Sequence, residues 1–215
     1  MLTIYKNPYQ CRLETEIIRR RFDGSHSHLQ LADSICFDYS GLNLPREDLE
    51  INEEKVSRIY FHDGRLIYVI PGKPDRSLVR LSLPFESRFL YQREISVRLL
   101  IRYILDLYFA IDKPGFRTEK TEDGLRSLLF IPGRFRPEDG PAILDRLKES
   151  LDRIIRAGLS IKTLEGDSGP ETTVFGLTKL AWMGPHLFNS AEIYRLDFSD
   201  GRQEDEGLLI PYRLR

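Results

Sequence analysis

The chain has 215 residues, of which 41% are hydrophobic and 11% aromatic, enough for one large domain or two small ones with packed cores. Its 32 Lys and Arg residues are balanced by 33 Asp and Glu residues, so any contact with RNA must come from a local patch. The N-terminus lacks a signal-peptide pattern and the longest apolar stretch contains charges, so we expect a cytoplasmic protein without a membrane partner. Cys11 and Cys36 form no C-x-x-C pair, which predicts reduced, buried thiols.

The first part of the chain has the alternating apolar pattern of β-strands. Strands are predicted at 9–23, 28–38, 56–70 and 78–83. The third of these is interrupted by Asp63-Gly64, a pair that favours a tight hairpin turn. Residues 1–84 are therefore predicted to form an N-terminal β-rich, barrel-like domain.

The pattern then changes to the spacing of helices. A broad apolar stripe predicts a mostly buried helix at 87–110, and a second helix is expected from Pro141 to a stop at Gly158. Further strands are predicted at 125–131, 173–180, 191–198 and 207–214. The fold class is therefore α+β, with residues 85–215 forming an antiparallel sheet packed with two main helices.

The segment 182–193 resembles the C-terminal signature of alanyl-tRNA editing domains, a C-G-G-T-H-V-x-N-T-x-E-I run. The residues that match in register are Gly184, His186, Asn189, Glu192 and Ile193. Three further blocks resemble the same family in the same order along the chain. The opening 5–9 is similar to the usual start, 33–47 matches at Asp33, Phe37, Gly41 and Pro45 and conservatively at Glu47, and 85–93 resembles the lead into the metal-binding helix.

This resemblance implies a free-standing relative of the editing domain of alanyl-tRNA synthetase. Family members deacylate mischarged tRNA(Ala), using zinc held by two histidines of a helix together with a Cys and a third His. The corresponding positions here are Ile95, Leu99, Trp182 and His186. Three of them have no lone pair to give, so we expect no zinc and no other cofactor. We also expect Trp182 to fill the former site by packing on Ile95 and Leu99.

The resemblance also suggests which residues would line a substrate pocket or contact RNA. The pocket candidates are Asp33, Ile35, Gly41, Asn43 and Asn189. The candidates for RNA contact are Arg88, Arg93, Arg98 and Arg102 of the long helix, and the run 19–21 offers another basic patch. The alternative is that the helix arginines form a solvated face or pair with neighbouring carboxylates.

Two questions about histidine stay open in the sequence. His26 and His28, with Cys36 nearby, could hold a relocated metal or could belong to a surface loop. His186 is the only catalytic candidate, but it could equally be satisfied by hydrogen bonds to the backbone, Asn189 or Glu192.

Three functional hypotheses follow. The first is a zinc-free binder of tRNA or of an aminoacyl-like ligand, with weak, salt-dependent RNA binding. The second is an aminoacyl-tRNA deacylase or other hydrolase that uses His186 or a relocated metal. The third is a protein-interaction module whose former active site is filled core.

Overall fold

The computed structural model describes residues 6–37, 40–111, 113–122, 124–166, 169–174, 179–181 and 184–215, without the side chains of residues 40, 165, 166, 169, 170 and 179–181. The chain is an α+β protein with two compact units. Unit 1 consists of residues 1–38 and 46–89, and unit 2 of residues 39–45 and 90–215. None of the helices in the described ranges has the length and apolar composition that crossing a membrane requires.

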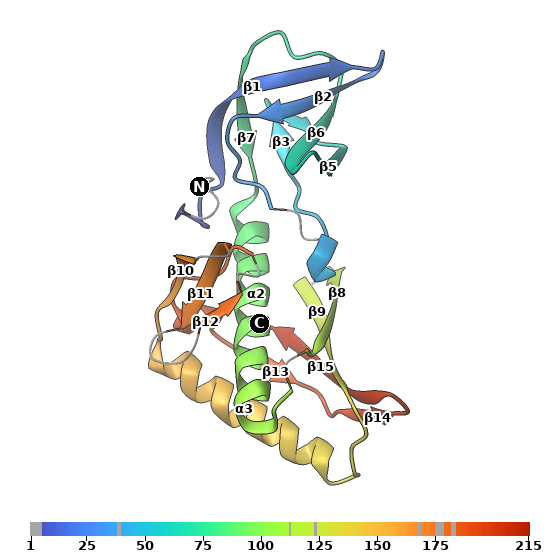
Figure 1. Ribbon diagram of the computed structural model, residues 1–215, viewed down its shortest axis with the longest axis vertical. Helices are drawn as coiled ribbons and strands as arrows, with labels where there is room; N and C mark the ends of the chain where they lie inside the picture. The colour runs from blue at the N-terminus through green and yellow to red at the C-terminus, as the bar shows by residue number, and fades with distance from the viewer. Residues whose placement is uncertain are drawn as a thin grey trace. The chain divides into compact units, whose positions relative to one another are not determined.

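Unit 1 is a curled antiparallel sheet of seven strands in the order β4-β3-β7-β1-β2-β6-β5 (Figure 1). The strands are β1 (Arg12–Phe22), β2 (His26–Leu31), β3 (Glu50–Ile51), β4 (Glu54–Lys55), β5 (Arg58–His62), β6 (Arg65–Pro71) and β7 (Leu78–Ser82). The predicted hairpin is confirmed, because Asp63 and Gly64 join β5 to β6 with φ angles of 50° and 70°. Positive φ at both central residues is the conformation that a type I′ turn needs.

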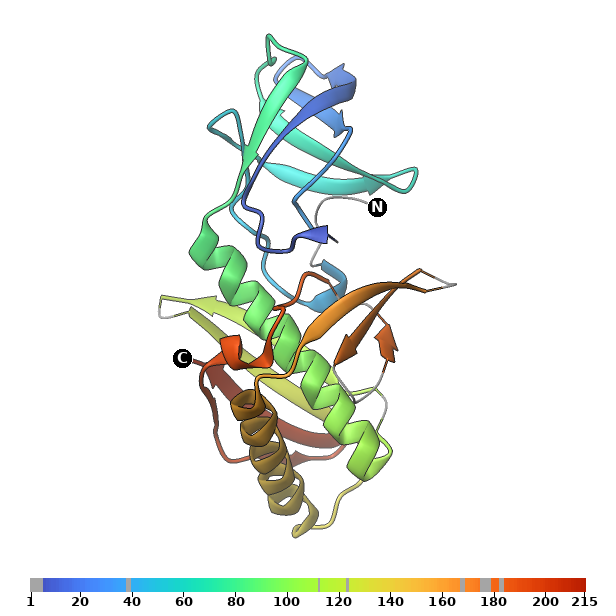
Figure 2. The same ribbon diagram turned by 90° about the vertical axis from the view of Figure 1, so that its left-hand side faces the viewer.

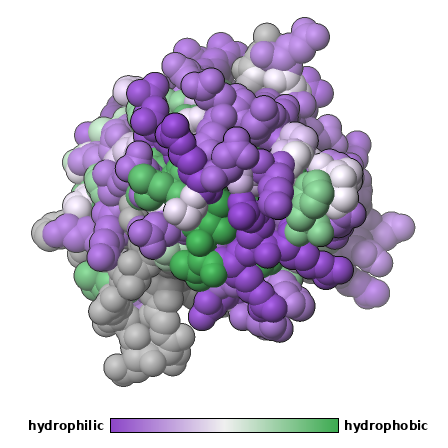
Figure 3. Space-filling view, turned by 90° about the horizontal axis from the view of Figure 1, so that it is seen from above, coloured by the Kyte–Doolittle hydropathy of each residue, from purple (hydrophilic) through white to green (hydrophobic). Residues whose placement is uncertain are grey.

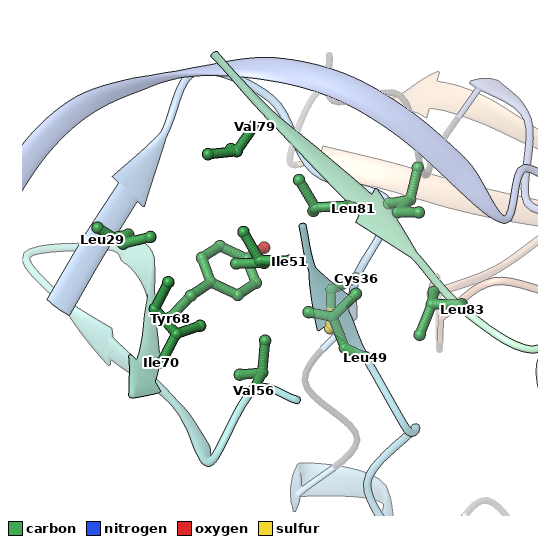
Figure 4. Packing of buried hydrophobic residues seen from close by; sticks show 11 residues of the cluster. Leu29, Cys36, Leu49, Ile51, Val56, Tyr68, Ile70, Val79, Leu81 and Leu83 are labelled. Carbon is green, nitrogen blue, oxygen red and sulfur yellow. The ribbon is translucent and has the colours of Figure 1, made fainter. Parts of the chain in front are cut away.

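The core of unit 1 lies on the concave side of this sheet (Figure 4). Alternate residues of the strands point inward, as the period of two requires. The core side chains include Leu29, Ile51, Tyr68, Ile70, Val79 and Leu81, each at most 3% exposed. Cys36 belongs to the same cluster at 2% exposed, so its predicted burial is confirmed, whereas Cys11 is only half-buried.

Strand β2 is shorter than the predicted strand 28–38, which is wrong beyond Leu31. The backbone amide of Ser34 bonds to the side chain of Asp33 at 2.7 Å, and the amide of Cys36 bonds to the Ser34 hydroxyl at 2.8 Å. Such local side-chain bonds satisfy amides that a strand would offer to its neighbour. The segment after Leu31 therefore leaves the sheet.

Unit 2 contains the sheet β13-β15-β9-β8, with β14 paired to β15, and the smaller sheet β10-β11-β12 (Figures 1 and 2). Its elements are η1 (Ser40–Leu42), most of α2 (Phe85–Phe109), β8 (Gly115–Thr121), β9 (Gly124–Pro132), α3 (Asp139–Ala157), β10 (Ile161–Gly166), β11 (Gly169–Val174), β12 (Lys179–Ala181), η2 (Ser190–Ile193), β13 (Leu196–Phe198), β14 (Arg202–Glu204) and β15 (Gly207–Leu214).

Both helices lie on the same face of the larger sheet. Tyr212 of β15 donates a hydrogen bond to Glu94 of α2, and Leu208 of β15 lies against Gly140 of α3. Leu208 and Tyr212 are four residues apart in one strand, so their side chains share a face.

The two predicted helices are confirmed to within two residues at each end. Helix α3 ends where expected, at Gly158, whose φ of 61° is the left-handed C-cap conformation that glycine adopts without strain. The two compact units do not divide the chain at a single point, since residues 39–45 belong to unit 2 and unit 1 extends to residue 89. The first turn of α2 belongs to unit 1, because Arg88 there pairs with Glu47.

Two predicted strands of unit 2 are wrong. The segment 173–180 is not one strand, since Thr173 of β11 pairs antiparallel with Lys179 of β12. The segment 191–198 begins as the short helix η2, and only its end forms β13. The sequence also missed β8 and β10, whose alternation is weak.

Candidate functional site

The positions that correspond to the family's zinc ligands are buried core where the structure describes them. Ile95 and Leu99 lie one turn apart on α2 and are both 0% exposed. Trp182 lies outside the described residues, so its predicted packing on Ile95 and Leu99 stays a prediction. Two of the positions that the resemblance aligns with zinc ligands are therefore closed to solvent as well as apolar.

His186, the only predicted catalytic residue, is 2% exposed and has hydrogen bonds at both ring nitrogens. Its Nδ1 lies 2.8 Å from the carbonyl oxygen of Leu187, and its Nε2 lies 2.9 Å from the hydroxyl of Thr163. Because a carbonyl only accepts, Nδ1 carries the proton and Nε2 accepts from Thr163. Burial lowers the pKa of His186, which holds the ring neutral. The structure therefore confirms the expected hydrogen bond of His186 to the backbone. The second partner of the ring is Thr163, not Asn189 or Glu192 as the sequence suggested.

Asn189 and Glu192 instead form the N-terminal cap of η2. The Asn189 side chain accepts from the amide of Ala191 at 2.8 Å, and Glu192 accepts from the amide of Asn189 at 3.0 Å. The Asn189 side chain also donates to the carbonyl of Gly158 at the end of α3. This capping box explains why the segment turns instead of extending as a strand. The hydrogen bonds of the Asn189 side chain are therefore those of a helix cap, and its pocket role stays a prediction.

The other pocket candidates are divided between the two units. In unit 1, Asp33 lines a cavity whereas Ile35 is 0% exposed and belongs to the core. In unit 2, Gly41 is exposed, and Asn43 donates to the carbonyl of Phe116 at 3.2 Å with a φ of 51°. Asp33 is therefore the pocket candidate whose side chain lines a cavity.

Arg88 is not an RNA contact, because its guanidinium is 0% exposed. It forms two bonds with the carboxylate of Glu47, at 2.7 Å and 2.9 Å, and donates to the carbonyl of Ile35. Removing these partners from the guanidinium would leave an unpaired charge in the core.

Arg93 and Arg98 are also buried, at 8% and 1% exposed. Arg93 donates to the carbonyl oxygens of Ile193 and Arg215, and Arg98 pairs with Glu94 at 2.8 Å. The predicted RNA contact is therefore corrected for three helix arginines, since buried guanidinium groups cannot reach a phosphate. Arg102 is half-buried and has a partner. The expected pairing of helix arginines with carboxylates is correct for Arg98 and Glu94.

The histidines of β2 form hydrogen bonds with other protein groups. The Nε2 of His28 lies 3.1 Å from Asp23, its Nδ1 lies 3.0 Å from the hydroxyl of Tyr60, and His26 bonds to Ser25. Within the described ranges, no three His, Cys, Asp or Glu side chains are grouped so that they could hold a metal ion. The Asp23 carboxylate accepts from two backbone amides and from His28, which holds its pKa well below the usual range.

Arginines gather instead on the outer face of the sheet in unit 1. The registers of β1, β2, β6 and β5 place Arg21, His28, Val69 and Arg58 in one row across the strands, and Arg19, Gln30, Ile67 and Tyr60 in the next. Side chains that pair across antiparallel strands point to the same face. We refer to Arg19, Arg21, Arg58 and Arg65, with His28 and Tyr60 between them, as the basic face.

The basic face is hollow. A cavity of about 440 Å³ is lined by Arg19, Arg21, Arg65, His28 and Tyr60 among others. Arg58 stacks over the ring of Tyr60, with its Cζ 5.3 Å from the centroid. Viewed from above in Figure 3, most of the visible surface is hydrophilic, with smaller hydrophobic areas between.

The basic face also has carboxylates beside its arginines, and one of them, Asp63, lines the same cavity. Asp23 is bonded to His28, and Asp63 lies 3.5 Å from His62. Sequence reasoning singled out the run 19–21 but missed Arg58 and Arg65. The alternation within 58–69 was the available signal, but only the strand register brings those residues to Arg19 and Arg21.

The sequence matches no protein-family model and no curated protein.

Proposed function

We propose that this chain is a zinc-free relative of alanyl-tRNA editing domains that binds RNA of the tRNA type on the basic face. The observation that carries the proposal is the placing of Arg19, Arg21 and Arg65 around one cavity, while Arg58 stacks over the ring of Tyr60 on the same face. Arginine suits phosphate because its planar fork donates two hydrogen bonds at once. Tyrosine offers a ring on which a base can stack.

Contacts between the matched blocks support the kinship with editing domains. Arg88 of the helix block bonds to Glu47 of the upstream block, within unit 1. Arg93 of the helix block bonds to Ile193 of the C-terminal block, within unit 2. Blocks that match a family in order, and whose matched residues contact one another, are harder to attribute to chance than separate short matches.

The hydrolase alternative has less support. A catalytic base must reach a substrate proton, but His186 is 2% exposed and both of its ring nitrogens are engaged. A protein-interaction module would have the same filled core at Ile95 and Leu99 as the proposed RNA binder. The two hypotheses differ because only the proposed function predicts RNA binding.

The test is binding of a tRNA(Ala) transcript by the purified chain, measured by fluorescence anisotropy at several salt concentrations. Four arginine–phosphate contacts should give a slope of about −3 in log K against log salt. The variant Arg19→Gln/Arg21→Gln should lower affinity and bring the slope to about half that value, because two phosphate contacts are lost.

The matched control is Arg153→Gln/Arg156→Gln, which removes the same charge from α3, where these side chains are 72% and 79% exposed. It should leave the slope unchanged. Equal losses in the two double variants, or no RNA binding by the unmodified chain at low salt, would overturn the proposal. The interaction-module reading would then be favoured.

A further inference from the structure

A second cavity adjoins the basic face. It has a volume of about 410 Å³ and shares Gln30 and Arg65 with the first cavity. Its lining is different in kind, since it includes the apolar side chains of Ile18, Phe37 and Phe61. The two cavities therefore adjoin, and we refer to them together as the groove, with a basic part and a mainly apolar part.

Gln30 stands where the two parts of the groove meet. Its side chain is only 8% exposed, and its Nε2 has no hydrogen-bond partner among the residues that the structure describes. A buried amide donor without a partner costs roughly 1–3 kcal/mol, so native proteins seldom leave one unless a ligand or water completes it. A hydrogen-bond acceptor at this point, from a ligand or from water, would satisfy the Gln30 amide.

The rim of the apolar part is open. Ile18 and Phe61 are 50% and 57% exposed. Ile18 occupies the bulge of β1, where the register shifts between Ile17 and Arg19, and a bulge changes the direction of the side chain that it carries. An exposed phenylalanine at the mouth of a cavity provides a surface for stacking a flat ring.

The charges of the groove set the orientation of a ligand. In the apolar part the carboxylate of Asp33 offsets Arg65, whereas in the basic part Arg19, Arg21 and Arg65 outnumber the carboxylate of Asp63 and so favour a phosphate. A nucleotide has both features, an anionic phosphate and a flat base whose edge carries donors and acceptors.

We propose that this groove binds one unpaired nucleotide of single-stranded RNA, with its phosphate at the arginines and its base beside Gln30 and Phe61. The inference rests on the proposed RNA-binding function and adds a preference for unpaired over paired RNA. A base in a duplex cannot enter, because its edge and faces are occupied by pairing and stacking.

The test compares a labelled single-stranded RNA of roughly ten nucleotides with the duplex of the same sequence. The unmodified chain should bind the single strand more tightly. Phe61→Ala should raise the Kd for the single strand by about tenfold, which is within the range for losing one stacked base. Gln30→Met keeps the length of the side chain but removes the donor, and should raise this Kd by about fivefold.

The matched control is Phe22→Ala, because Phe22 is an exposed aromatic residue of the same sheet, at 44%, that lines neither cavity. It should leave the Kd unchanged, and neither groove variant should alter duplex binding. Single-strand binding that is unaffected by Phe61→Ala refutes the inference and leaves the proposed function standing. Absence of any RNA binding by the unmodified chain refutes both. Phe61 is exposed, so its variant tests the groove even if Gln30→Met is unstable.

Discussion

Replacing Ile95 and Leu99 by histidine, the residue that the proposed kinship with editing domains aligns with these positions, tests whether this part of α2 is core. Both side chains are 0% exposed. Each replacement removes an apolar side chain whose burial stabilises the fold by about 1.5–3 kcal/mol. Each also buries an imidazole, at a cost of about 1–3 kcal/mol if it finds no partner.

The expected loss is therefore about 2.5–6 kcal/mol for Leu99→His alone. Natural domains unfold with a free energy of about 5–15 kcal/mol, so the double variant Ile95→His/Leu99→His should be largely unfolded. The assay is urea unfolding followed by circular dichroism, in which the midpoint shifts at constant slope if only stability has changed.

The control is Leu107→His, the same substitution on the same helix at a side chain that is 55% exposed. It should change stability by less than about 0.5 kcal/mol. Equal midpoints for Leu99→His and Leu107→His would refute the reasoning, because Leu99 would then adjoin an open, wet pocket. A zinc titration of the double variant adds a second readout, since zinc binding stabilises only a site whose ligands face one another.

Three further predictions concern buried polar groups. Glu47→Gln should destabilise the chain by about 3–5 kcal/mol, because it leaves the Arg88 guanidinium buried without its countercharge. In urea unfolding, the double variant Glu47→Leu/Arg88→Met should lose less unfolding free energy than the sum of the losses of its two single variants. Burial lowers the folded-state pKa of His186, so the unfolded chain binds more protons as the pH falls. The stability that depends on neutral His186 is complete above about pH 6.5 and is lost as the pH falls from there through the folded-state pKa. The variant His186→Gln should therefore show a smaller fall in unfolding free energy between about pH 8 and about pH 5 than the unmodified chain. Tyr212→Phe removes the 2.6 Å bond to the buried carboxylate of Glu94 and should cost about 1.5–3 kcal/mol in the same assay, whereas an unchanged midpoint would show that the bond contributes nothing.

The sequence by itself determined the elements that depend on local signals. The apolar stripes defined α2 and α3, Gly158 defined the end of α3, and Asp63-Gly64 defined the hairpin. These signals act within a few residues, so they are visible without the fold. Elements with weak alternation, β8 and β10, depend on pairing with neighbouring strands and were missed.

The tertiary structure alone decided which arginines are buried and which are available to a ligand. Arg88 and Arg93 find their partners 41 and 100 residues away in sequence, and these contacts withdraw them from solvent. Arg19 and Arg65 are also far apart in sequence, and only the register of β1, β2 and β6 places them around one cavity. A charged side chain looks the same in the sequence in both cases, because its burial is set by partners that local patterns do not contain.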